Sequence, residues 1–142
     1  MNNQPIAFAL LGMSTDQFAT ISDPTTDEGG LEISSAIKTD YKERYVGIGL
    51  LIKFTSGGDV FLQIEASTHF EIAEESWMLL SAGNSQDVTL PKDFLSHLMT
   101  IAVGTTRGIL HGKTDGTAFN KYFLPLIDVS KLDAADVVIP KE

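Results

Sequence analysis

Polar and apolar positions alternate regularly through the first half of the chain. Between residues 31 and 38, Leu31, Ile33 and Ile37 share one side, and charged or small residues take the other. This period of two predicts an antiparallel strand with one face in solvent. From residue 46 to residue 54 every second residue is apolar, which predicts a neighbouring strand with a strong core face.

Two further strands are expected on either side of this pair. Ile6 to Leu11 alternates, and the strand is expected to resume near Phe18 and Ile21, before a loop over residues 22–30. Residues 56–59 (Ser-Gly-Gly-Asp) are typical of a hairpin turn, because glycine supplies the positive φ that such turns need. The strand that follows spans residues 60–72. Its period breaks at residues 67–69, where we expect a bulge that returns the last residues to the core.

The second half of the chain changes to a helical period. Thr89 is a candidate N-cap, Pro91 is expected in the first turn, and the helix is expected to run to about Leu110. Apolar residues lie almost all the way round this helix. One small sheet covers only one face of it, so we expect the opposite face to meet another subunit.

Small residues spaced four apart form a strip on one side of the same helix. The strip would permit close approach of a second element; the alternative is that Gly104 or Gly108 ends or kinks the helix. The residues of this oligomer strip are Ser96, Thr100, Gly104 and Gly108.

Strands followed by helices predict an α+β fold of two layers. We expect a four-stranded antiparallel sheet packed against the long helix, with a short C-terminal helix near Val129–Ala134. Residues 74–80 are either a short helix or an amphipathic connector. We expect one domain over residues 1–142, with residues 1–5 and 135–142 as flexible tails.

Charge and composition exclude several classes of function. The formal charge of −9 repels phosphate backbones and anionic membranes, so neither nucleic acid nor a membrane is an expected partner. The chain has no cysteine and three histidines, and we expect no metal and no cofactor. The apolar run of residues 6–11 is too short to span a bilayer, so a cytoplasmic protein is expected.

The histidines do not form a recognisable catalytic constellation. His69 falls at the expected bulge, His97 on the helix and His111 at the helix end, and no hydrolase or zinc-protease motif is present. We therefore do not expect an enzyme. Arg107 is expected to be structural, paired with a carboxylate such as Asp128 or Glu71.

Two short motifs resemble the SecB family of export chaperones over roughly residues 5–132. The first is Phe-Leu-Gln-Ile-Glu at residues 61–65, followed by His-Phe-Glu-Ile at 69–72. The second is the Pro91-led helix with Thr-Arg-Gly at 106–108, followed by Leu-Pro-Leu-Ile-Asp at 124–128. The resemblance implies a homodimer or homotetramer that holds unfolded polypeptides without ATP, with a role in preprotein export.

The chain also departs from that family pattern. Leu126 replaces the second proline of the family ending, and Thr15 and Ala19 take positions that are acidic in members serving the translocation ATPase. Residues 137–142 hold no zinc ligand. These departures argue against docking to the export motor, although Glu65 remains a candidate for partner docking. The alternative function is a SecB-like scaffold or adaptor with one specific partner, such as an antitoxin.

Exposed aromatic and methionine side chains are the candidates for client binding, because such side chains adapt to varied partners. For the run from Trp77 to Leu80, the alternative is packing beneath the helix. The client-binding candidates are Tyr41, Tyr45, Trp77, Met78 and Phe123.

Overall fold

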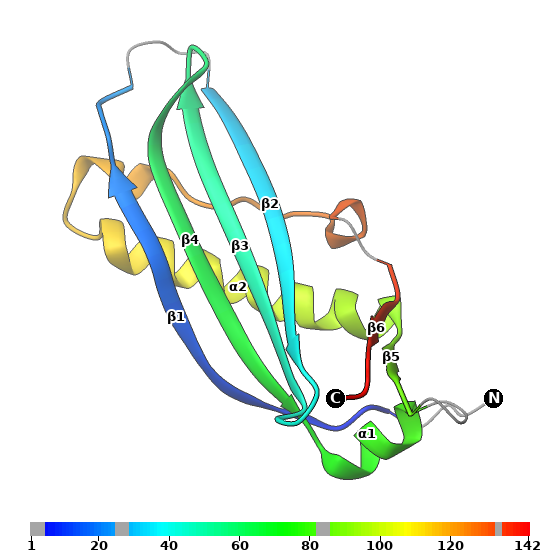
Figure 1. Ribbon diagram of the computed structural model, residues 1–142. Helices are drawn as coiled ribbons and strands as arrows, with labels where there is room; N and C mark the ends of the chain where they lie inside the picture. The colour runs from blue at the N-terminus through cyan, green and yellow to red at the C-terminus, as the bar shows by residue number, and fades with distance from the viewer. Residues whose placement is uncertain (1–4, 25–28, 82–85, 133–134) are drawn as a thin grey trace.

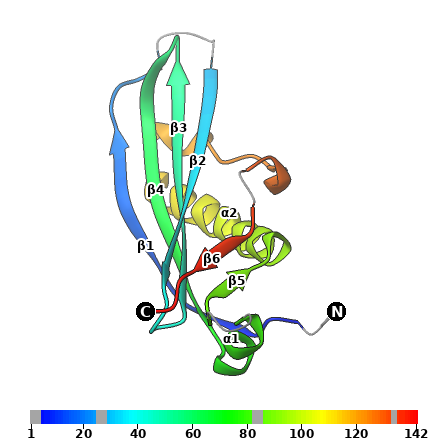
Figure 2. The same cartoon turned by 45° about the vertical axis from the view of Figure 1, so that its right-hand side comes forward.

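The computed structural model describes residues 5–24, 29–81, 86–132 and 135–142, and shows the expected α+β architecture (Figure 1). A four-stranded antiparallel sheet has the order β1-β4-β3-β2, and a long helix lies across one face (Figure 2). The elements are β1 (Phe8–Thr20), β2 (Gly29–Asp40), β3 (Tyr45–Ser56), β4 (Asp59–Ile72), α1 (Glu74–Leu80), β5 (Val88–Leu90), α2 (Lys92–Thr114), η1 (Ala118–Lys121), η2 (Val129–Lys131) and β6 (Val137–Ile139).

The two central strands supply most of the core. Even-numbered side chains of β3 from residue 46 to 54, and of β4 from residue 62 to 72, are buried on the face that α2 covers. β3 and β4 pair one to one through residues 67–69 of β4, so the bulge predicted there is wrong. The prediction failed because Ala66 and Thr68 continue the buried face of β4, each with 1% exposure. A threonine at a core position is read as a break when the pattern counts only large apolar residues.

The bulges lie instead on the edge strand β1 and at the start of β4. Leu11 and Asp16 of β1 have no opposing partner in the β1–β4 ladder. Each extra residue reverses the alternation of side chains, which is why the apolar period fades after Leu11 although the strand continues to Thr20. The two-residue turn between β3 and β4 is confirmed, with φ of 59° at Gly57 and 90° at Gly58.

The long helix begins two residues later than predicted. Thr89 lies in β5 and Pro91 occupies the N-cap position, so the assignments of Thr89 as N-cap and Pro91 to the first turn are wrong. The backbone N–H of Lys92 donates instead to Oδ1 of Asp136, at 2.8 Å. A carboxylate from a distant segment therefore caps this helix, and no local sequence signal marks it.

The outward face of α2 is small and polar rather than broadly apolar. Its large apolar residues are buried or half-buried against the rest of the core, whereas Thr100, Gly104 and Gly108 are exposed. A Cβ at either glycine would meet no atom within 4 Å, and neither glycine ends the helix, which continues to Thr114. Ser96 is half-buried, and its carbonyl accepts from the Thr100 hydroxyl. Contact of the strip with another subunit remains a prediction.

The last described segment is paired, where a flexible tail was expected over residues 135–142. Val137–Ile139 forms β6 against β5, and Ile139 is only 3% exposed. The short helix expected near 129–134 is a 3₁₀ turn, Val129–Lys131; residues 133 and 134 lie outside the described residues. The 3₁₀ turn η1 was not predicted. In the described part of the chain, no helix is long and apolar enough to cross a membrane.

Candidate functional site: an aromatic pocket beside α1

A pocket of about 290 Å³ lies where three segments distant in sequence meet. The segments are the turn after β2, the short helix α1 and the chain just before β5, which lie at one end of the sheet (Figure 1). Tyr41 and Trp77 provide aromatic walls. The lining residues are Tyr41, Trp77, Met78, Ser81 and Gln86.

Tyr41 is fixed at both ends of its side chain. Its ring packs edge-on against Trp77, with centroids 5.4 Å apart and an interplanar angle of 71°, an arrangement favoured by the ring quadrupoles. Its hydroxyl donates to the backbone carbonyl of Gln86 at 2.9 Å. The ring is therefore held as a rigid wall while one side remains open to the pocket.

Helix α1 presents different faces to the core and to solvent. Ser76 and Trp77 are buried, whereas Met78 is 68% exposed and Leu79 is 58% exposed. Of the two alternatives for residues 74–80, the short helix is confirmed. The expectation that the run from Trp77 to Leu80 packs beneath the long helix is wrong for Met78 and Leu79, which are exposed. Adjacent exposed apolar side chains beside a pocket are typical of an interaction surface.

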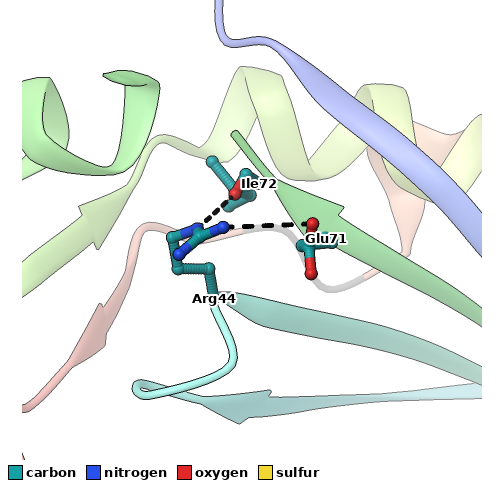
Figure 3. Close-up of polar contacts among 3 residues, drawn as sticks. All are labelled: Arg44, Glu71 and Ile72. Carbon is teal, nitrogen blue, oxygen red and sulfur yellow. Dashed lines mark hydrogen bonds and ion pairs between the residues drawn. The ribbon is translucent and has the colours of Figure 1, made fainter. Parts of the chain in front are cut away.

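Arg44 anchors the turn that carries Tyr41. Figure 3 shows the contacts of its side chain with Ile72 and Glu71. The Arg44 guanidinium Nε donates to the carbonyl of Ile72 at 2.9 Å, and the Arg44 carbonyl accepts from the Ile72 N–H at 2.9 Å. Its own N–H donates to the Tyr41 carbonyl. Arg44 adopts φ of 51°, an unfavourable conformation for a non-glycine residue, so these bonds hold a strained turn.

The ion pair of Arg44 is weaker than its hydrogen bonds. Nη2 lies 4.0 Å from Oε1 of Glu71, and the two side chains are 31% and 42% exposed. Such a pair contributes little in solvent. The sequence analysis missed Arg44 because its role depends on the backbone of β4, which no motif in the turn reveals.

The composition of the pocket favours binding of an apolar side chain over chemistry. Two aromatic rings and a thioether surround a few hydroxyl and carbonyl groups. The volume of about 290 Å³ lies just below the roughly 300–1,000 Å³ that ligand pockets span. Among the described residues, no group of three or more His, Cys, Asp or Glu side chains is placed to hold a metal ion.

The structure brings together three of the five client-binding candidates, Tyr41, Trp77 and Met78. Phe123 is 62% exposed but lies elsewhere, because its neighbour Tyr122 packs on Phe61 near the β3–β4 turn, at the opposite end of β3. The structure does not place Phe123 with the pocket residues.

Tyr45 also lies away from the pocket, on the sheet face opposite α2. Its hydroxyl is 2.6 Å from Nδ1 of His69, whose Nε2 is 2.9 Å from Oγ of Ser14. Hydroxyls of Ser14 and Ser67 donate to the carboxylate of Asp16. Burial, and secondarily the charge of Asp16, raise the pKa of Tyr45.

Glu65 lies on this same outer face, opposite Leu51 of β3 and Gln17 of β1. It is partly exposed, and its role in partner docking remains a prediction. His97 contacts the ring of Phe8, and His111 lies near Asn120 at the end of α2. The three histidines therefore occupy separate surroundings.

Arg107 is structural, but its predicted carboxylate partners are wrong. Its Nε donates to the carbonyl of Leu124 at 2.6 Å, and its Nη2 donates to the carbonyl of Pro125 at 2.7 Å. Both acceptors belong to the motif segment after the helix, so Arg107 fixes that segment against α2 through backbone oxygens.

No family model and no curated protein matches the chain. A crystal structure of a Streptococcus agalactiae protein of unknown function is similar, with a TM-score of 0.46 and 13% identity, covering 88% of this chain and 100% of the other. A Mycobacterium tuberculosis SecB-like chaperone, solved with an antitoxin peptide, has a TM-score of 0.44 and 12% identity, covering 87% and 90%.

Proposed function

We propose that this chain binds extended apolar segments of polypeptide clients without nucleotide, as a SecB-like holdase in the cytoplasm. The supporting observation is the exposure of Met78 and Leu79 beside the pocket walled by Tyr41 and Trp77. A client side chain entering the pocket would be enclosed by aromatic rings, and the neighbouring residues of the client would cover the two exposed side chains of α1.

The energetics of such a surface favour broad recognition. Burial of one large apolar side chain contributes about 1.5–3 kcal/mol, so binding requires several contacts and depends on area more than on sequence. The net charge of −9 favours solubility of the empty protein and attracts clients with basic residues. No cofactor and no catalytic step are part of this proposal.

The second candidate function is an adaptor that binds one specific partner. The observation that favours it is the directional polar rim of the pocket, where Gln86 and Ser81 lie beside aromatic walls. A rim of this kind distinguishes one side chain from another. Two unrelated denatured proteins separate the candidates, because a holdase protects both of them and an adaptor protects neither.

Suppression of aggregation tests the leading proposal. A chemically denatured test protein is diluted into buffer without ATP, with the wild-type chain, M78E or L126E present. Leu126 is 94% exposed and lies outside the pocket, so L126E introduces the same charge on an exposed apolar residue away from the proposed site. We expect wild type and L126E to protect equally and M78E to lose most of the protection. Equal protection by M78E and wild type would contradict the proposal.

We also propose self-association, as a homodimer or homotetramer, through the strip of small residues on α2. The strip consists of the half-buried Ser96 and the exposed Thr100, Gly104 and Gly108. Open space over both glycines supports close approach of a second helix. Sedimentation equilibrium over a range of concentrations measures the mass, and G104L/G108L would shift it toward the monomer. A wild-type monomer at all concentrations would remove this part of the proposal.

A further inference from the structure

Residues 136–141, here named the strap, are held against β5 and α2 by backbone and carboxylate contacts. β6 pairs with β5 through three residue pairs, Val88 with Ile139, Thr89 with Val138, and Leu90 with Val137. On either side of this ladder, Asp136 caps the Lys92 N–H, and the Lys141 N–H donates to Asp87 Oδ1 at 2.9 Å.

The strap has the side-chain pattern of an extended apolar peptide added to a sheet edge. Ile139 is 3% exposed and Val137 is half-buried, whereas Val138 between them is 57% exposed. The opposing residues Val88 and Leu90 are fully buried. In recognition by strand addition, backbone bonds supply affinity and alternate side chains are buried. Ile139 is buried in this way and Val137 partly so.

The N-terminal end of β5 adjoins the aromatic pocket. Ser81, which lines the pocket, makes an isolated antiparallel bridge to Val88 on the edge of β5 opposite β6. Gln86, which accepts the Tyr41 hydrogen bond, directly precedes Asp87, which accepts the Lys141 hydrogen bond. A peptide paired with β5 would therefore extend directly toward Tyr41 and Trp77.

The pairing is small enough to open locally. Two strands of three residues form a two-stranded sheet, and such a sheet is marginal without further packing. Segments with few buried apolar contacts open at a free energy below that of global unfolding. Ile139 is the one fully buried apolar side chain among the strap residues.

We infer that the strap is an internal occupant of a strand-addition site on β5, and that an extended client segment with apolar residues at alternate positions displaces it. This inference rests on the proposed function, because the displaced strap leaves a groove that leads into the client pocket. The strap is tethered, so it competes with a client for β5 at high effective concentration. Only molecules with an open strap bind the client, so the apparent client affinity is the intrinsic affinity multiplied by the open fraction.

A reversible cross-link tests the inference on the full chain. Thr89 and Val138 oppose each other, Thr89 is half-buried and Val138 is exposed. The chain has no cysteine, so T89C/V138C would contain its only thiols. The probe is a fluorescent peptide, Ala-Asp-Val-Val-Ile-Pro-Lys-Glu, that copies residues 135–142, and its control carries Asp in place of Ile.

We expect the reduced T89C/V138C chain to bind the probe as wild type does, and the oxidised chain to bind at least about tenfold more weakly. A chain ending at residue 135 is expected to bind at least about tenfold more tightly than wild type, and the control peptide to bind none of them. Equal binding by the oxidised and reduced forms would overturn the inference. A second result would also overturn the inference. If the wild-type chain forms a dimer that the probe does not dissociate, and removal of the strap abolishes this dimer, the strap is exchanged between two copies.

Failure of the strap inference and failure of the proposed function give different results. If the strap does not open, the oxidised and reduced forms protect a denatured client equally, and that protection is still lost in M78E. If the proposed function fails, M78E changes nothing in either redox state, whatever the probe peptide does at β5.

Discussion

The hydroxyl of Tyr45 lies 2.6 Å from Nδ1 of His69, with the two rings stacked on the outer face of the sheet. Tyr45 reaches His69 by lying across Gly47, where a Cβ would clash with the tyrosine hydroxyl and approach its Cζ to 2.8 Å. At Gly47 that space is filled by a side chain of the same strand.

Replacing Gly47 by alanine therefore displaces Tyr45. We expect G47A to destabilise the fold by about 1 kcal/mol, because the Tyr45–His69 hydrogen bond is lost. G49A is the matched control, since its Cβ would stand 3.6 Å from Ser67 Oγ, an ordinary contact. Urea unfolding of both variants measures the difference. Equal stability of G47A and G49A would show that Tyr45 does not depend on the missing Cβ.

The raised pKa of Tyr45 predicts a loss of stability at alkaline pH. Burial, followed by the charge of Asp16, raises this pKa above its ordinary value of 10.0, so the folded chain retains the phenol proton more strongly than the unfolded chain. The contribution is complete below about pH 10 and is lost as pH rises through the folded pKa. Unfolding measured from pH 8 to 11 should show a steeper decline for wild type than for Y45F; parallel curves would contradict the assignment.

Thr68 carries a polar atom that the core does not satisfy. Its Oγ1 is buried and has no hydrogen-bond partner among the described residues. T68V keeps the shape and removes the unpaired hydroxyl, so we expect it to stabilise the fold by about 1 kcal/mol. T106V is the comparison, because the buried Thr106 hydroxyl donates to the Ala102 carbonyl at 2.8 Å. Thermal unfolding should rank T68V above wild type and T106V; a destabilised T68V would contradict this reading.

Arg44 is expected to act on client binding through Tyr41. R44A removes the donor to the Ile72 carbonyl and should destabilise the fold by about 1–2 kcal/mol, while loosening the turn that positions Tyr41. E71Q removes only the long ion pair and should change stability little. Affinity for an apolar peptide, measured below the unfolding range of R44A, should fall for R44A and stay constant for E71Q. Unchanged affinity in R44A would show that the pocket does not need this anchor.

The sequence predicted those features of the fold that a few adjacent residues determine. The alternation of β3 and the glycine turn at Gly57 and Gly58 are found where the sequence indicated, because period and positive φ are properties of a few adjacent residues. β1 was predicted in two pieces because its bulges at Leu11 and Asp16 reverse the period. The false bulge in β4 came from reading a buried threonine as a solvent position.

Features that depend on distant partners were not predictable in this way. The three residues of β6 form a strand because β5 lies opposite, and Asp136 caps α2 from 44 residues away in the chain. The pocket was predicted in part, because Tyr41, Trp77 and Met78 are large apolar or aromatic side chains in short segments next to the long strands. Tyr45 and Phe123 have the same chemistry, and only the fold separates them from the pocket.

The most direct measurement of the central claim uses Trp77, the single tryptophan of the chain, as its own reporter. An extended peptide of apolar residues at alternate positions is titrated into wild type, M78E and L126E while Trp77 emission is recorded. The account predicts a saturable change for wild type and L126E, with an affinity at least about tenfold weaker for M78E, since one apolar contact is lost. No change in wild type, or one curve for all three proteins, would contradict it.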